Sequence, residues 1–316
     1  PQFCRAYLPR DYAPDGKWPM IVSLHGYNAP NPPYVRWWGS DQRHDRWADR
    51  YHVIMLAPHG RGNTWYRGIG DQDVVRCIEL AKQRFSVDEE RVYLTGYSMG
   101  GGGTWHIGTR HPELFAAIAP YYGGWDYHVS LPEERLAKLT PAERLRLERE
   151  SSFAQAEQLL NLPIWVMHGD SDPVVEVAQS RYPVRMLQRW GYDLRYQEVP
   201  GRAHEDLGTE DALYQWFLTH RRQANPPHVR VRAPELKSAS AYWLKVTQRR
   251  DPSGFVHADA EVVSPATIRL DTDNALEVVL SPGPSLVDPG KPVRVIWNGD
   301  EVGEIRLDKN GEAVLR

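Results

Sequence analysis

The sequence is poor in features that would tie the chain to a metal, a membrane or a nucleic acid. It has only two cysteines among 316 residues, Cys4 and Cys77, and their spacing is not that of metal ligands. They permit either one disulfide or two buried thiols, and we expect thiols. No apolar run approaches the about 18 residues that a membrane-spanning helix needs. Lys and Arg are scattered and the formal net charge is −3, so we expect no nucleic-acid partner and no membrane partner. We also expect no metal and no cofactor.

Phenylalanine is also scarce, with 6 Phe against 12 Trp and 16 Tyr. Rings with a polar edge are common where a site meets water or binds sugars and aromatic groups, although most of them pack around a large sheet. The length of the chain accommodates one large domain and a smaller one, or a single enlarged domain.

Short apolar runs alternate with amphipathic segments as far as about residue 222. The runs are closed by Gly or Pro and lie at 20–24, 52–58, 91–96, 115–120, 163–169 and 194–199. Helical periodicity places Val74, Ile78, Ala81 and Phe85 on one face of a helix at 71–85, and Thr209 at the N-cap of a helix at 209–221. This alternation predicts an α/β fold, a doubly wound and mostly parallel sheet over residues 1–222.

Residues 126–161 form a connection that is too long for a simple crossover. Ser130 with Glu133, and Thr140 with Glu143, fit the capping box that begins a helix. The charge-dense helices that follow predict a surface insertion, which is either a lid over a site or a decorative excursion. We expect a lid.

The pattern changes to period 2 after residues 223–227, with no helical window between the alternating runs. Asn298-Gly299 and Asn310-Gly311 lie between such runs, and each predicts a hairpin. We interpret 223–227 as a linker and 228–316 as a small all-β domain resembling a sandwich.

The stretch GYSMGGGGTW, residues 96–105, places Ser98 directly after a predicted strand and directly before an amphipathic helix. A G-x-S-x-G in this context indicates a nucleophile elbow rather than a glycine-rich turn with an incidental serine. We expect Gly96 and Gly100 to leave room at the sharp turn. The three glycines at 101–103 should let the helix lie close to the sheet, with its N-terminus toward negative charge near Ser98.

A serine hydroxyl needs a base, and the base needs an acid; in a doubly wound hydrolase both follow the serine, the acid first. The strand at 163–169 runs into DSDPVV, which offers Asp170 and Asp172. We favour Asp172, because it lies further out in the loop before Pro173, whereas Asp170 suits a turn cap. His204 is the histidine in the loop between the next strand and the last helix. We interpret the other histidines of turns and helices as structural.

Ester or amide cleavage also needs two donors for the oxyanion. The backbone N–H of Met99 is one candidate, and that of Tyr27, in HGYN after the strand at 20–24, is the other, unless this HG is only a tight turn.

Two tryptophans follow strand ends on the elbow side of the sheet, Trp65 in GNTWYRG and Trp125 in YYGGWD. Both are candidates to stack on a sugar ring or an aromatic acyl group, with core packing as the alternative. Trp37 and Trp38 are lesser candidates.

These motifs together resemble the α/β-hydrolase superfamily. YLPRDY, SLHGYN, GYSMGGGGTW, HGDSDPVV and PGRAHED are similar to the esterase and prolyl-oligopeptidase-like branch, which includes feruloyl esterases and polyhydroxybutyrate depolymerase-like proteins. The resemblance covers residues 1–222 and implies a metal-free triad of Ser98, Asp172 and His204, an oxyanion hole at Tyr27 and Met99, and a cap at 126–161. Residues 228–316 resemble the β-rich tails of bacterial members. An extracellular or periplasmic location is expected from the resemblance alone.

We therefore predict a serine esterase that acts through an acyl-enzyme, with feruloyl or acetyl esters of plant polysaccharides, or small esters, as substrates. One alternative is a serine peptidase of the prolyl-oligopeptidase type, although no segment here has the size of the propeller that usually gates such enzymes. The other is a catalytically inactive scaffold whose β-rich part binds a polysaccharide, against which the presence of all three triad residues argues.

Overall fold

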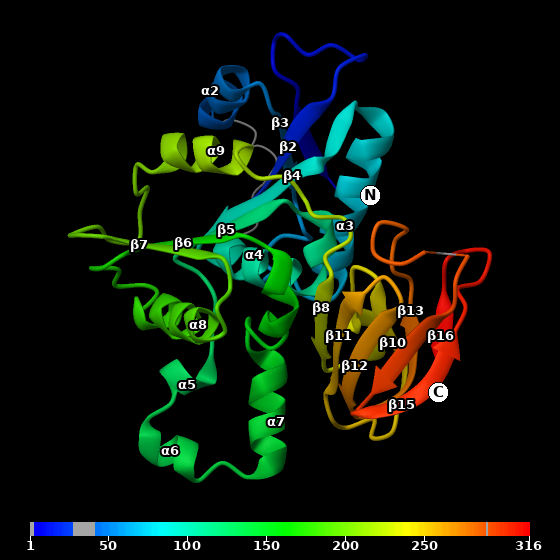
Figure 1. Ribbon diagram of the computed structural model, residues 1–316. Helices are drawn as coiled ribbons and strands as arrows, with labels where there is room; N and C mark the ends of the chain where they lie inside the picture. The colour runs from blue at the N-terminus through cyan, green and yellow to red at the C-terminus, as the bar shows by residue number, and fades with distance from the viewer. Residues whose placement is uncertain (1–2, 28–41, 289) are drawn as a thin grey trace.

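The computed structural model describes residues 3–27, 42–288 and 290–316. Trp37 and Trp38 lie outside the described residues. A seven-stranded sheet has the order β1-β3-β2-β4-β5-β6-β7, and only β1 runs antiparallel to its neighbour (Figure 1). The six predicted apolar runs form β2 to β7, so the predicted parallel sheet is confirmed. The strands are β1 Cys4–Tyr7, β2 Trp18–Leu24, β3 Ile54–Pro58, β4 Val87–Tyr97, β5 Ala117–Tyr121, β6 Ile164–Gly169 and β7 Leu194–Val199.

Helices cover both faces of this sheet (Figure 1). On one face lie α3 Ile69–Arg84, α4 Met99–Arg110 and α8 Ala178–Arg189, and on the other lie α2 Gln42–Tyr51 and α9 Glu210–Leu218. Alternate residues of one strand therefore belong to different cores: Met20 and Val22 pack with α3 and α4, and Ile21 packs with α2 and α9. Burial on both faces explains why β2 is apolar throughout instead of alternating.

The two predicted helices are present, with differences at their ends. Val74, Ile78 and Ala81 of α3 are buried as expected, whereas Phe85 is the C-cap and only partly buried. Thr209 is the N-cap of α9, but its side chain makes no capping hydrogen bond and instead lies 2.9 Å from the Tyr121 hydroxyl. The Thr209 hydroxyl thus hydrogen-bonds to the buried tyrosine instead of capping the helix.

The segment at 126–161 contains α5 Tyr127–Ser130, α6 Glu133–Ala137, α7 Pro141–Glu150 and the short 3-10 helix η2 Ala156–Asn161. The capping box of Thr140 and Glu143 is confirmed at the start of α7. The one predicted at Ser130 is wrong, because Ser130 ends α5 and Pro132 is the N-cap of α6. The fixed φ of Pro132 suits the entry to a helix, and the Ser130 hydroxyl donates to the Asp126 carbonyl instead.

Residues 228–316, called the β module from here on, form two sheets that share one core. One sheet has the order β15-β14-β12-β11-β8 and the other β16-β13-β10-β9. The strands are β8 His228–Ala233, β9 Ser240–Ala241, β10 Leu244–Arg249, β11 Val256–Ser264, β12 Thr267–Asp273, β13 Ala275–Leu280, β14 Val293–Trp297, β15 Asp300–Ile305 and β16 Ala313–Leu315. That residues 223–227 act as a domain linker stays a prediction.

One of the two predicted hairpins is confirmed. Asn298 and Gly299, both with positive φ, join β14 to β15, and Trp297 pairs with Asp300 across the turn. The hairpin predicted at Asn310-Gly311 is wrong, because β15 and β16 lie in different sheets and β16 pairs with β13. The dipeptide makes a turn there, but the turn carries the chain from one sheet to the other.

Two buried glutamines join the β module to the α/β part. Gln158 donates to the Thr109 carbonyl at 2.7 Å and accepts a hydrogen bond from the Arg232 N–H at 3.3 Å. Gln155 donates to the Ser238 carbonyl at 3.1 Å and to the Gln158 side chain at 3.1 Å. Gln158 lies on η2 and Gln155 is its N-cap, so the start of this helix connects α4 on one side with strand β8 and the segment before β9 on the other.

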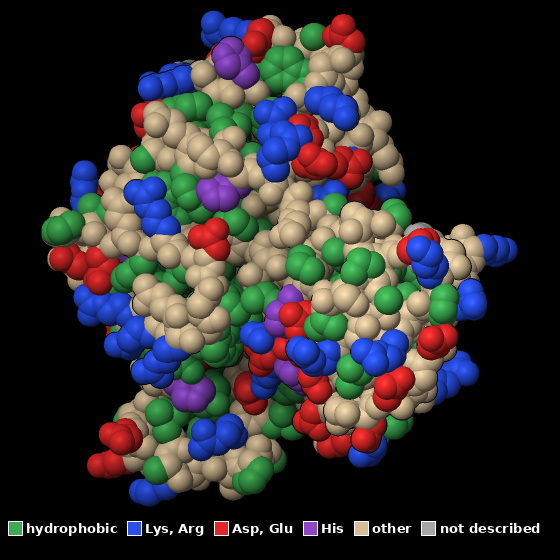
Figure 2. Space-filling model, in the orientation of Figure 1, with side chains coloured by type: hydrophobic (Ala, Val, Ile, Leu, Met, Phe, Trp, Pro, Cys, Tyr) green, Lys and Arg blue, Asp and Glu red, His purple; other side chains and the backbone are tan. Residues whose placement is uncertain are grey.

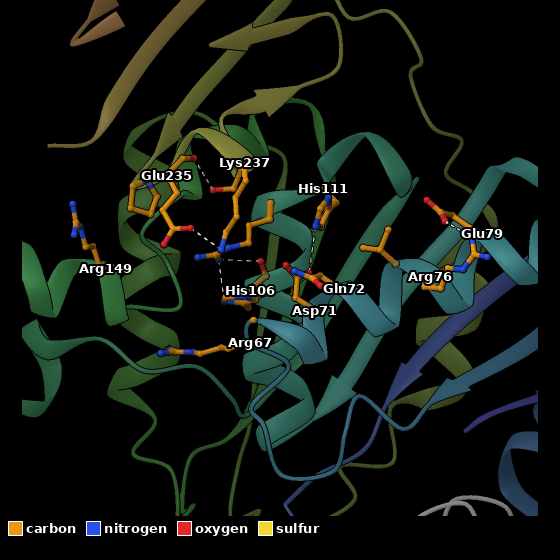
Figure 3. Close-up of a pocket in the computed structure, with 15 residues that line it drawn as sticks. Arg67, Asp71, Gln72, Arg76, Glu79, His106, His111, Arg149, Glu235 and Lys237 are labelled. Carbon is orange, nitrogen blue, oxygen red and sulfur yellow. Dashed lines mark hydrogen bonds and ion pairs between the residues drawn. The ribbon is translucent and has the colours of Figure 1, made fainter. Parts of the chain in front are cut away.

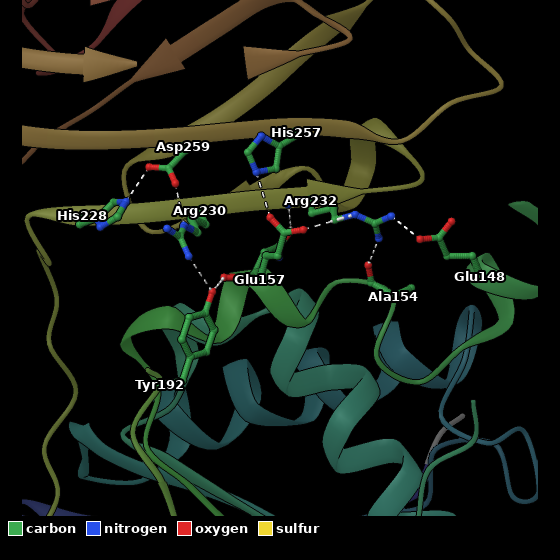
Figure 4. A network of polar contacts seen from close by, with 10 residues as sticks. Glu148, Ala154, Glu157, Tyr192, His228, Arg230, Arg232, His257 and Asp259 are labelled. Carbon is green, nitrogen blue, oxygen red and sulfur yellow. Dashed lines mark hydrogen bonds and ion pairs between the residues drawn. The ribbon is translucent and has the colours of Figure 1, made fainter. Parts of the chain in front are cut away.

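Charged groups surround this contact (Figure 4). Arg232 of β8 pairs with Glu148 of α7 and donates to the Ala154 carbonyl at 2.5 Å. Glu157 pairs with His257 of β11 at 2.9 Å and raises the pKa of that histidine. The junction thus combines ion pairs at its edge with amide hydrogen bonds inside.

Charges of both signs are interspersed on the face shown in Figure 2, in keeping with the near-neutral net charge. Within the described residues, no helix is long and apolar enough to cross a membrane. Both cysteines are free thiols; Cys77 is buried, and Cys4 is exposed rather than buried as expected.

Candidate active site

Ser98 sits at a strained turn between β4 and α4. Its φ of 58° and ψ of −116° lie in a region that L-residues other than glycine rarely adopt. The turn is held on both sides, because the Ser98 N–H donates to the Tyr121 carbonyl at 3.2 Å and the Ser98 carbonyl accepts from the Gly102 N–H at 3.0 Å. The strand and helix that the sequence predicts around Ser98 thus form the expected elbow.

The glycines around Ser98 leave room for backbone. A Cβ on Gly96 would lie 2.5 Å from the Gly100 carbonyl oxygen, and a Cβ on Gly100 would lie 2.7 Å from the Leu24 carbonyl carbon. A Cβ on Gly103 would meet the Tyr66 ring at 2.8 Å. At Gly102 the nearest atom would be 3.4 Å away, which is ordinary contact. Glycine is therefore required at positions 96 and 100, as expected from the sequence, whereas position 102 has room for a Cβ.

The structure brings Ser98, His204 and Asp172 into one hydrogen-bonded chain. His204 Nε2 lies 2.8 Å from Ser98 Oγ, and His204 Nδ1 lies 2.7 Å from Asp172 Oδ2. The imidazole side chain is 20% exposed and the carboxylate is 0% exposed. A histidine that donates a hydrogen bond from Nδ1–H to a buried carboxylate has its Nε2 unprotonated, and Nε2 can therefore accept the serine proton.

Backbone amides hold Asp172 in place. Its Oδ1 accepts from the N–H groups of Val174 at 2.8 Å and Val175 at 2.9 Å. Burial opposes ionisation, but the hydrogen bonds from Val175, His204 and Val174 outweigh it and keep the pKa of Asp172 below its ordinary value. Asp170 instead accepts from the Gly201 N–H at 2.7 Å and so ties two loops together.

A second histidine, His168, supports the loop that carries Asp172, a role that its position at a strand end did not indicate. It is fully buried, with Nδ1 2.7 Å from Ser180 Oγ and Nε2 3.0 Å from the Val175 carbonyl. Its Nε2 also lies 3.3 Å from Asp172 Oδ2. Burial lowers its pKa, so the ring is neutral near pH 7 and braces the loop without adding charge.

The backbone after β2 approaches the elbow closely. A Cβ on Gly26 would lie 3.7 Å from Ser98 Cβ, and the His25 ring nitrogens lie near the carbonyls of Gly26 at 2.8 Å and His59 at 3.0 Å. Tyr27 follows directly and is 54% exposed. Met99 is the first residue of α4. The N–H groups of Tyr27 and Met99 stay our expected oxyanion donors.

A pocket of about 340 Å³ opens beside Ser98. Both predicted tryptophans line it: Trp65 is 49% exposed and Trp125 is half-buried. The rest of the lining, which no sequence motif indicated, comes from the β5–α5 turn, α5, the acid loop and α8. These residues are Gly123, Gly124, Ser130, Val174, Val175, Glu176 and Gln179.

The segment at 126–161 contributes little to this pocket. Ser130 is its only member in the lining within the described chain. Arg149 of α7 donates to the Ser253 carbonyl, so this helix lies against the β module. Closure of the segment over Ser98 stays a prediction.

Residues 51–222, more than half of the chain, match the family model described as "Prolyl oligopeptidase family". A bifunctional acetylxylan esterase/xylanase of Neocallimastix patriciarum is 34% identical over 177 residues, 55% of this chain and 22% of the relative. Dipeptidyl-peptidase 5 of Aspergillus fumigatus is 25% identical over 65% of this chain and 31% of its own length. Feruloyl esterase B of Neurospora crassa is 30% identical over 35% of this chain and 42% of its own length.

A solved structure titled as a thermostable esterase is similar with a TM-score of 0.51 and 26% identity, covering 69% of this chain and 59% of that one. The alignments span less than half of each curated relative. The resemblance to the esterase and prolyl-oligopeptidase-like branch is confirmed by these matches.

Proposed function

The chain belongs to the prolyl oligopeptidase family, and from that premise we propose that it is a serine esterase whose nucleophile is Ser98. The observation that carries the proposal is the hydrogen-bonded chain from Ser98 through His204 to Asp172, set at a strained elbow. Relatives named as acetylxylan and feruloyl esterases favour an ester over an amide.

In the proposed reaction, Ser98 Oγ attacks the ester carbonyl while His204 Nε2 takes the hydroxyl proton. The N–H groups of Met99 and Tyr27 stabilise the oxyanion, and Asp172 stabilises the imidazolium. His204 then returns the proton to the leaving alcohol, which leaves an acyl-enzyme on Ser98. A water molecule, deprotonated by the same imidazole, releases the acid and restores the serine.

Feruloyl or acetyl esters of plant polysaccharides are the proposed substrates. The exposed Trp65 and the half-buried Trp125 border the pocket at Ser98, where a planar acyl group or a sugar ring would stack on them. The pocket volume of about 340 Å³ suits one such group and leaves the remainder of a polymer outside. Release to an extracellular or periplasmic space would suit such a substrate and stays a proposal.

The second candidate is a peptidase. One observation favours it: Glu176 is the only charged residue among those that line the pocket in the described chain, and a carboxylate there would attract the ammonium group of a peptide. The dipeptidyl-peptidase relative points the same way. We prefer the esterase because the two tryptophans and two valines give the remaining wall an aromatic and apolar character.

The test compares hydrolysis of p-nitrophenyl acetate, methyl ferulate and a Gly-Pro anilide by the purified chain and its Ser98→Ala variant. We expect the esters to be cleaved faster than the anilide, and the variant to lose about 10³-fold or more in kcat. A fluorophosphonate probe should label the wild type and a Ser171→Ala control, and spare Ser98→Ala. Faster anilide cleavage would favour the peptidase, and an unlabelled wild type would favour an inactive scaffold.

A further inference from the structure

A second cavity, larger than the pocket at Ser98, lies where the α/β part meets the β module. Its volume is about 570 Å³, and none of its lining residues lines the Ser98 pocket. Its walls come from α3, α4 and α7 on one side and from residues 234–238 of the β module on the other (Figure 3). We call it the junction cavity.

Every acidic side chain of the junction cavity already has a basic partner. Asp71 lies 3.3 Å from His111, Glu79 lies 3.2 Å from Arg76, and Glu235 lies 2.7 Å from Lys237. These three pairs are drawn in Figure 3. The acids therefore form no direct ion pair with the other cations in the wall.

Three arginines of the wall have neutral partners. Arg67 donates to the Glu150 carbonyl at 2.5 Å, and Arg149 donates to the Ser253 carbonyl. Arg110 lies 2.9 Å from His106 Nδ1 and also donates to the His106 carbonyl at 3.3 Å. Within the described chain, none of the three guanidinium groups has a carboxylate within ion-pair distance. The cavity thus carries three guanidinium groups without a direct ion pair, and the nearby carboxylates of Asp71, Glu150 and Glu235 act on them only from a longer distance.

Burial makes two of these charges, on Arg67 and Arg110, costly, whereas Arg149 is exposed. It lowers the pKa of Arg110 to about 10, and it lowers the pKa of Arg67 as well. Burial also keeps the pKa of His106 well below its ordinary value, so the ring is neutral and accepts a hydrogen bond from Arg110. An anion bound in the cavity would stabilise these guanidinium groups by Coulomb attraction.

We propose that the junction cavity binds an organic anion of about the size of a sugar, through a carboxylate or phosphate held by Arg67, Arg110 and Arg149. Guanidinium groups bind both kinds of oxyanion through paired hydrogen bonds. In Figure 3, Arg67 and Lys237 lie on either side of His106, and Arg149 stands apart from them at the left of the view. The volume exceeds what an inorganic ion fills, and Gln72 and Ser238 of the wall offer polar groups to the rest of such a ligand.

The first experiment is calorimetric titration of the full chain at low ionic strength with D-glucuronate and with glucose 6-phosphate; glucose and inorganic phosphate serve as comparators. We expect at least one of the two anionic sugars to bind with a stoichiometry of one. Comparison of D-glucuronate with glucose 6-phosphate then shows whether the cavity prefers a carboxylate or a phosphate. Glucose should not bind, and binding should weaken as added salt shortens the Debye length from about 30 Å toward about 3 Å. No binding of either anionic sugar, or equally tight binding of inorganic phosphate, would overturn the proposal.

Substitutions then locate the site. Arg149→Gln should weaken binding about tenfold. Arg146→Gln removes the same charge from the same helix but from a side chain outside the cavity wall, and should change binding less than about twofold. Equal losses in the two variants would mean a long-range charge effect and would refute the site.

A gain of affinity provides the second readout. Glu235 is exposed and pairs with Lys237, so Glu235→Gln should free the lysine for the ligand and tighten binding about threefold. A merely structural role of these charges predicts no gain, and an unchanged or weaker affinity would count against the proposal. Ester hydrolysis should be unaffected in all three variants, because none of these residues lines the pocket at Ser98.

Discussion

Asp172→Asn is the change that tests the proposed chemistry most directly, because it alters a proton position and little else. An asparagine has the same shape, and its carbonyl oxygen can still accept from the N–H groups of Val174 and Val175. Its amide nitrogen would then face His204 Nδ1, 2.7 Å away in the wild type, and would donate where the carboxylate accepted. The imidazole would have to carry its proton on Nε2, the nitrogen that faces Ser98.

The expected loss is large. With Nε2 protonated, the histidine cannot accept the serine proton, and in serine proteases with this arrangement the same change lowers kcat by about 10⁴-fold. At about 1.4 kcal/mol for each factor of ten, this corresponds to about 5.5 kcal/mol of transition-state stabilisation. KM should change little, because Asp172 is fully buried and does not line the pocket.

The assay is steady-state hydrolysis of p-nitrophenyl acetate, with Asp170→Asn as the matched control. Asp170 lies two residues earlier and bridges to the Gly201 N–H, so its loss should lower stability modestly and leave kcat within about tenfold. Urea unfolding of both variants would show that they fold. If Asp172→Asn kept kcat within about tenfold of the wild type while Asp170→Asn lost it, the acid assigned here would be wrong.

Three further predictions concern packing, pH and specificity. Gly100→Ala should destabilise the fold by about 3 kcal/mol because its Cβ would overlap the carbonyl of β2, whereas Gly102→Ala should be neutral or gain up to about 1 kcal/mol; urea unfolding measures both. The hydrogen bond that His257 donates to Glu157 raises the pKa of His257, so this contact stabilises fully below about pH 6.5 and is lost as pH rises through the raised value. The difference in urea midpoint between wild type and His257→Gln should accordingly shrink from pH 6 to about pH 9, and a constant difference would argue against this contribution. Trp65→Ala should raise KM for methyl ferulate about fivefold and barely change that for p-nitrophenyl acetate, since only the former offers a large ring to stack; equal changes would exclude such stacking.

The parts of the fold set by local pattern could be predicted from the sequence. Continuous apolar runs identified the buried parallel strands, and G-x-S-x-G at a strand end identified the elbow at Ser98. Chain order then singled out Asp172 and His204, because both loops follow strands of one parallel sheet and must meet at its carboxyl edge.

The remainder depends on contacts between distant segments. His168 braces the acid loop only because α8 brings Ser180 against it, and no spacing in the sequence signals that contact. Asn310-Gly311 has the local chemistry of a hairpin, but the pairing of β16 with β13 decides its geometry. The capping box predicted at Ser130 is absent for a local reason, because Pro132, two residues later, is the N-cap of the helix.

The amide contacts of Gln155 and Gln158 have a consequence for how this architecture can evolve. A β module joined only by a flexible linker could be exchanged between hydrolases without loss of stability. Here its removal would take one hydrogen-bond partner from each of the buried side-chain amides of Gln155 and Gln158. Any recombination that exchanged the C-terminal third would have to bring a matching carbonyl and N–H to η2, or replace both glutamines by apolar residues. The two parts should therefore be inherited together, and changes on one side of the seam should be accompanied by changes on the other.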